Sequence, residues 1–183
     1  MKKITIFALV FIIALSACNV SAKVPKGCPE KTSIIVTSKE FGNTKFDKIT
    51  PWYIEDQKVL DIGIRYGILY FVNYENFDPN YPDAFGHAYK DLERTLTIGI
   101  KNLDNSEKIS TGVWPDVHGK KIADAFIYSS SEDPGKNIGM QIIEPSHVEI
   151  TYFGQDYVCG KAQISNTHFD IKGDFIANYK KLL

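Results

Sequence analysis

The amino-acid sequence predicts an all-β domain, an antiparallel β-sandwich or barrel of about eight strands with one short inserted helix. Three observations support this fold class. Several segments place apolar residues at every second position, and other short segments are rich in β-branched and aromatic residues. Gly, Pro, Asn and Asp separate these segments. A length of 183 residues with 44% hydrophobic residues suits one domain with a substantial core.

The first predicted strand covers residues 32–38, with the sequence TSIIVTS between charged residues. The following segment, residues 39–57, contains Gly42, Asn43 and Pro51 and has no clean period. We therefore expect a loop there, with at most one short strand.

The clearest alternation runs over residues 59–72, where Leu60, Ile62, Ile64, Tyr66, Ile68, Tyr70 and Val72 occupy every second position. This pattern predicts one long strand, or two strands with a break near Gly67. Residues 95–104 repeat the pattern, because Leu96, Ile98 and Ile100 alternate with Thr95, Thr97 and Gly99. A second half-buried strand is expected there.

Five further strands are predicted around Phe126, Ile142, Ile150, Val158 and Ile171. Residues 154–156, Gly-Gln-Asp, are typical of a hairpin turn between the third and fourth of these strands. Gly173 lies inside the last strand and predicts a bulge or a bend there.

One segment, residues 82–96, has helical character. Pro82 and Asp83 suit the first turn of a helix, and Ala84, Ala88 and Leu92 would share one helical face. We expect one short helix here, inserted between strands.

The N-terminus has the layout of a secretory signal. Lys2 and Lys3 precede an apolar run of 12 residues, 4–15, and small residues follow. A helix needs roughly 20 apolar residues to cross a bilayer, so this run is too short to be a transmembrane span.

The four residues Leu15-Ser16-Ala17-Cys18 resemble the lipobox of bacterial lipoproteins. That resemblance implies cleavage before Cys18 and attachment of lipid to it. The alternative is ordinary cleavage after Ala22, which would release a soluble periplasmic or secreted protein beginning at Lys23. We favour the lipobox because all four positions match at the end of the apolar run.

This interpretation divides the chain into a signal peptide (1–17), a lipidated tether (18–29) and a single β-rich domain (30–183). It implies a membrane partner through the lipid anchor and a place in the cell envelope. Asn19 is not the aspartate that the lipoprotein family associates with retention in the inner membrane, which points to the outer membrane.

Cysteine number predicts one disulfide. The chain has three cysteines, and with Cys18 lipidated or removed, Cys28 and Cys159 remain. An even number of cysteines in an exported protein favours their pairing over two separate thiols.

Charge argues against a nucleic-acid partner. Loss of residues 1–17 leaves 19 of the 21 Lys and Arg residues against 22 Asp and Glu residues, a formal charge of about −3. No concentrated basic run is present.

Catalytic and metal motifs are weak in this sequence. His87, His118, His147 and His168 lack the spacing of a helical metal pair, and no nucleophile elbow or phosphate loop occurs. We therefore expect no metal and no cofactor, and an enzyme is the less favoured reading. The open alternative is an envelope hydrolase with His118 or His147 and an Asp/Glu pair, chosen from a set that includes Glu55, Asp56, Asp116, Glu132 and Asp133.

The most unusual segment is residues 70–89, where aromatic residues alternate with amides and carboxylates. Aromatic rings beside such groups suit sugars and protein partners, because each ring supplies a rigid contact area. The opposing interpretation is that these rings fold back and close one end of the domain. We expect a non-catalytic binding or structural role with a protein or glycan partner, through a candidate binding loop formed by Tyr74, Phe77, Asp78, Asn80 and Tyr81.

Overall fold

The computed structural model describes residues 24–40, 42–56, 65–80, 90, 92–103, 108–115, 120–129, 137–143 and 145–182. Strands account for all the regular structure in these residues. The strands are β1 (Ile34–Ser38), β2 (Gly42–Phe46), β3 (Trp52–Asp56), β4 (Arg65–Val72), β5 (Thr95–Asn102), β6 (Gly112–Trp114), β7 (Lys121–Tyr128), β8 (Ile138–Ile142), β9 (His147–Phe153), β10 (Tyr157–Ser165) and β11 (Phe169–Leu182). The all-β prediction is confirmed.

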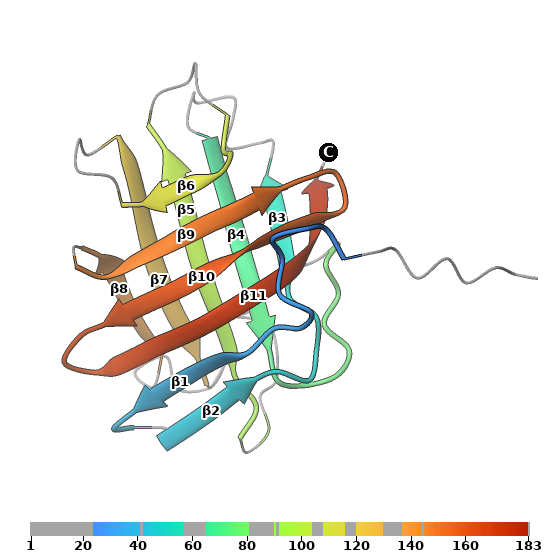
Figure 1. Ribbon diagram of the computed structural model, residues 1–183. Coiled ribbons are helices and arrows are strands. Elements are labelled where there is room, and N and C mark those ends of the chain that lie inside the picture. The colour runs from blue at the N-terminus through green and yellow to red at the C-terminus, as the bar shows by residue number, and fades with distance from the viewer. Residues whose placement is uncertain are drawn as a thin grey trace, which may run out of the picture.

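All the described strands belong to one sheet that folds over on itself. The order is β6-β9-β10-β11-β3-β4-β5-β7-β8, and β1 and β2 extend from β11 as a side branch. Figure 1 shows two layers: β1, β2, β6, β9, β10 and β11 cross in front of β3, β4, β5, β7 and β8. We call these the front layer and the back layer. Strand β6, at one end of this path, also contacts β7, the strand next to the other end.

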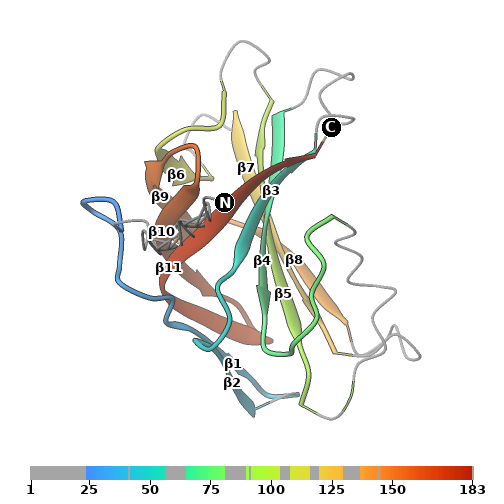
Figure 2. The same ribbon diagram turned by 90° about the vertical axis from the view of Figure 1, so that its right-hand side faces the viewer.

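Strand β11 connects the two layers. One of its edges pairs with β10 along residues 170–178. Its other edge pairs with β1 at residues 169–172 and with β3 at residues 178–182. Figure 2 shows its C-terminal part running from the front layer to the side of β3.

Gly173 lies at the point where β11 leaves β1, and its φ of +141° is a conformation that other residues rarely adopt. A Cβ at this position would lie 2.2 Å from the backbone oxygen of Ser33. The pairing of β11 with β10 continues through Gly173 without a shift in register. A register shift occurs instead in the pairing of β10 with β9, between Cys159 and Gly160. The glycine therefore permits the close approach of the chain before β1.

The core lies between the layers. From the back layer it includes Leu69, Phe71, Leu96, Ile98, Ile100, Ala123, Ala125 and Ile127, and from the front layer Trp114, Val148, Ile150, Val158, Ile164, Ile171 and Phe175. The core thus mixes small alanines with large aliphatic and aromatic side chains from both layers. Trp114 is fully buried, so this tryptophan is a core residue.

Several details differ from the sequence prediction. The described residues contain eleven strands instead of about eight, and the pairing of β11 with β3 is parallel. The segment 39–57 supplies two strands, β2 and β3, because pairing partners in β1 and β4 compensate for its poor period. Strand β4 continues through Gly67 without a break.

The expected helix over residues 82–96 falls mostly outside the described residues. Its end is not helical: Thr95 and Leu96 begin β5, where β4 and β7 supply the hydrogen-bonding partners. The alternation over 95–104 therefore outweighs the helical spacing at this boundary.

Candidate functional site

The candidate binding loop folds onto the back layer where the structure describes it. Tyr74 is only 6% exposed, and its hydroxyl forms a 2.8 Å hydrogen bond with the Thr95 hydroxyl. The expectation that Tyr74 is available at the surface is wrong. The alternative interpretation, in which loop aromatics fold back and close the domain, describes this residue better.

The rest of the described loop, from Phe77 to Asn80, contacts β4 and β11. The Phe77 ring packs against Tyr70, with 5.4 Å between ring centroids. The exposed Asp78 carboxylate accepts hydrogen bonds from the backbone and side-chain nitrogens of Asn80, which lower the pKa of Asp78. The Asn80 side-chain oxygen accepts a hydrogen bond from Lys180. Tyr81 lies outside the described residues.

The outer face of the back layer brings a second group of polar and aromatic side chains together. Gly99 on β5 lies opposite Ile68 on β4 and Asp124 on β7. A Cβ at Gly99 would lie 2.2 Å from Asp124 Oδ1 and 2.9 Å from Tyr66 Oη. Both side chains therefore lean over the glycine, which leaves room for them on the sheet surface.

Lys101 completes this group. Its Nζ atom is 2.6 Å from Asp124 Oδ2 and lies 5.0 Å from the centroid of the Tyr66 ring. The ammonium thus contacts a carboxylate and an aromatic face together, and both side chains of the ion pair remain partly exposed. We call Tyr66, Gly99, Lys101 and Asp124 the polar cluster.

The environment of the polar cluster changes how its tyrosine titrates. Burial raises the pKa of Tyr66, and the negative charge of Asp124 adds to the rise. Burial also raises the pKa of Tyr128 at the far end of β7, while a hydrogen bond with Thr97 opposes the rise. Both phenols therefore stay neutral at physiological pH and can donate hydrogen bonds.

Phe126 lies beside the polar cluster and is, among the described residues of this face, an exposed aromatic. It is 40% exposed, and it leans across onto the neighbouring strand β8. A Cβ at Gly139 would lie 2.1 Å from Phe126 Cε1, so the ring occupies the space that a side chain would fill. Its plane is nearly parallel to the Tyr128 ring, at 17°. The ring therefore packs over Gly139 and stays partly open to solvent.

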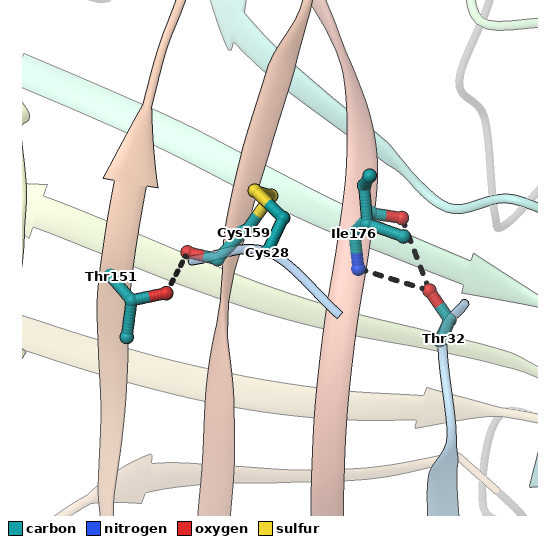
Figure 3. Close-up of a disulfide and its surroundings, with 5 residues drawn as sticks. All are labelled: Cys28, Thr32, Thr151, Cys159 and Ile176. Carbon is teal, nitrogen blue, oxygen red and sulfur yellow. Dashed lines mark hydrogen bonds between the residues drawn. A yellow bond between two sulfur atoms is a disulfide. The ribbon is translucent and has the colours of Figure 1, made fainter. Parts of the chain in front are cut away.

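The front layer fastens the N-terminal segment to the domain. Cys28 and Cys159 form a disulfide, as predicted from the cysteine number. Nearby, Thr32 Oγ1 donates a hydrogen bond to the Ile176 carbonyl and accepts one from the Ile176 N–H. Figure 3 shows both fastenings side by side on β10 and β11. The segment that leads back to Cys18 thus leaves the domain from the front layer.

The other residues singled out from the sequence are dispersed. His147 Nδ1 is 3.1 Å from the Pro145 carbonyl, and His168 lies 3.5 Å from Glu40. Glu55 accepts a hydrogen bond from the Tyr179 hydroxyl. Among the described residues, no group of three or more His, Cys, Asp and Glu side chains is arranged to hold a metal ion. His87, His118, Asp116, Glu132, Asp133 and the side chain of Asp56 lie outside the described part of the chain.

The comparisons bear on the N-terminus. Residues 1–19 match the family described as prokaryotic membrane lipoprotein lipid attachment site. The N-terminus of this chain is therefore that of a bacterial lipoprotein. The matched residues include Cys18, so the lipoprotein is anchored in the cell envelope by lipid, as the lipobox predicted. Neither the curated proteins nor the solved structures yielded a match to the chain. In the described part of the lipoprotein, no helix is long and apolar enough to span a membrane.

Sequence reasoning did not identify the polar cluster or Phe126. The alternation over residues 59–72 did place Tyr66, Ile68 and Tyr70 on one face of β4. That face is the outer one, because Leu69 and Phe71 enter the core instead. The missing information was the pairing of β5 with β7, which brings Asp124 opposite Gly99.

Proposed function

We propose that this lipoprotein is a non-catalytic binding protein on the outer membrane, and that it binds a sugar residue of an envelope glycan on the outer face of β5, β7 and β8. The single observation that supports this most is the Phe126 ring, which lies over Gly139, is 40% exposed and lies beside an Asp–Lys pair. The margin would come from the candidate binding loop, through Phe77, Asp78, Asn80 and Tyr81.

The chemistry of the face suits a neutral sugar ring. One side of a pyranose presents C–H groups, which pack against an aromatic face, while its hydroxyls point outward around the rim. Asp124 supplies carboxylate acceptors and Lys101 supplies ammonium donors within the same face. Because the two groups neutralise each other, the cluster favours an uncharged hydroxyl-bearing ligand over an ion.

The position of the face also agrees with a role in the envelope. Residues 24–33 run along the front layer, and Figure 2 shows them on the opposite side of the molecule from β5, β7 and β8. A lipid at Cys18 would therefore anchor the domain through its front layer. The outer face of the back layer would stay accessible to a ligand. Asn19, in place of an aspartate, supports the outer membrane as the site of anchoring.

The test is binding of the lipidated protein, held in vesicles, to a panel of neutral and charged oligosaccharides. We expect a neutral member to bind, and Phe126→Ala to weaken that binding about tenfold or more, as loss of an aromatic anchor does. Asp124→Asn should also weaken it. The matched control is Val113→Ala on β6, because Val113 is 43% exposed and lies on the front layer.

Two results would contradict the proposal. One is the absence of binding to every member of the panel at millimolar sugar. The other is binding that Phe126→Ala leaves unchanged. Circular dichroism of each variant shows whether it is folded, which separates loss of the ligand contact from loss of the domain.

A further inference from the structure

Among the described strands, β6 and β8 end the sheet path and β2 ends its side branch, and these three edges differ in how they are protected. Strand β2 carries Lys45, and β6 is three residues long and followed by Pro115. Strand β8 has five residues, Ile-Gly-Met-Gln-Ile, with no charge and no proline. Charges, prolines and short length are the usual means by which proteins keep sheet edges from pairing with other chains. By this measure β8 is the unprotected edge.

The residue after β8 adds to this contrast. Ile143, directly after β8, is 64% exposed. Within the described residues, β8 pairs with β7 alone. A strand whose second edge has no described partner, and which carries no charge, is suited to strand addition.

We propose that β8 pairs antiparallel with β8 of a second copy, so that the lipoprotein forms a symmetric dimer through one continuous sheet. The sequence of the strand is self-complementary about Met140. In that register Ile138 faces Ile142 of the second copy, and Gly139 faces Gln141. Apolar residues thus meet apolar residues on the inner face, and no like charges oppose each other.

The symmetry of such a pair agrees with lipid anchoring. Two antiparallel copies of one strand are related by a two-fold axis perpendicular to the sheet, which keeps equivalent faces on the same side. Both front layers, each carrying a disulfide-held tether, would therefore face one membrane. Confinement of both copies to that membrane raises their effective concentration and favours the pair.

The first test is cross-linking of the lipidated protein in vesicles. Met140→Cys places one cysteine at the axis, opposite its own copy, where two facing strand residues are close enough for a disulfide. Thr44→Cys, at the centre of the Lys45-bearing edge β2, is the matched control. We expect mild oxidation to link Met140→Cys into a dimer and to leave Thr44→Cys largely monomeric. Equal linking of the two variants, or less at position 140, would overturn the proposal.

A second test uses charge at the exposed Gln141, whose side chain would lie diagonally across the axis from its own copy. Gln141→Lys and Gln141→Glu should each weaken the dimer about fivefold, and a mixture of the two variants should recover it. The dimer fraction is measured by analytical ultracentrifugation in detergent micelles. A wild-type protein that is monomeric there and in vesicles, or charge variants that behave like it, would contradict the dimer. Neither test involves a sugar, so its outcome is independent of the glycan proposal.

Discussion

The outer faces of the two layers carry different groups. On the front layer, the disulfide between Cys28 and Cys159 and the hydrogen bonds of Thr32 fix the N-terminal segment to β10 and β11. On the back layer, the polar cluster and Phe126 remain partly exposed. Under the proposed function, the front layer is the attachment side and the back layer is the recognition side, with the core between them.

The back layer is itself divided. At the start of β5, Tyr74 is buried over the sheet and its hydroxyl is hydrogen-bonded to the Thr95 hydroxyl. Phe126, by contrast, is exposed and packs over Gly139. Both are aromatic residues of the same face, yet one seals the sheet and the other is open to solvent. Their substitution should therefore have opposite consequences for stability and for binding.

The largest expected effect comes from Tyr74→Ala. Removing a buried aromatic side chain leaves a cavity and an unpaired Thr95 hydroxyl, and we expect a loss of about 3–5 kcal/mol in the free energy of unfolding. Phe126→Ala should lose less than about 1 kcal/mol, because its ring is already partly hydrated. Urea denaturation of both variants measures the difference. Equal losses would remove the distinction between a sealing and an exposed aromatic.

The next effect concerns the attachment side. Replacing both Cys28 and Cys159 with Ala opens a loop with a sequence separation of 131 residues. We expect a loss of about 2–4 kcal/mol in the free energy of unfolding, mainly because the unfolded chain regains freedom. Sugar binding at the back layer should be unchanged at temperatures where the variant is folded. Loss of binding in the folded variant would show that the two sides are not independent.

The smallest effect is a pH dependence of the recognition side. Burial, reinforced by Asp124, raises the pKa of Tyr66 above its ordinary value of about 10. As the pH rises past about 10, the unfolded chain releases this proton while the folded chain keeps it, so stability falls. Tyr66→Phe should make this fall shallower. Denaturation midpoints at pH 9 and pH 11 measure it, and an identical fall in both proteins would contradict the burial of Tyr66.

Much of the fold follows from local sequence pattern. Strand β10 lies where a strand was predicted around Val158, directly after the hairpin turn predicted at 154–156. The prediction for residues 39–57 allowed at most one short strand, whereas the structure has β2 and β3, because pairing that local pattern does not encode stabilises them. Strand β11 passes from one layer to the other and pairs with β3 in parallel, a long-range feature that no window of sequence reveals.

The candidate site was less predictable than the fold. Aromatic density along the chain drew attention to residues 70–89, but exposure depends on what packs above each ring. Tyr74 is buried where its hydroxyl reaches Thr95 on β5. The Phe126 ring lies at the surface, in the space that Gly139 leaves by having no side chain. That relation joins two strands through their register, so it appears only when the sheet is assembled.

The most direct test of the two-sided account is hydroxyl-radical footprinting of the lipid-anchored protein in vesicles, with and without the neutral sugar that binds best. Tyr66 and Phe126 report on the recognition side, and the half-buried Tyr157 on β10 reports on the attachment side. We expect the sugar to slow oxidation of Phe126 and Tyr66 and to leave Tyr157 unchanged. Protection of Tyr157 with no protection of Phe126 would contradict the account.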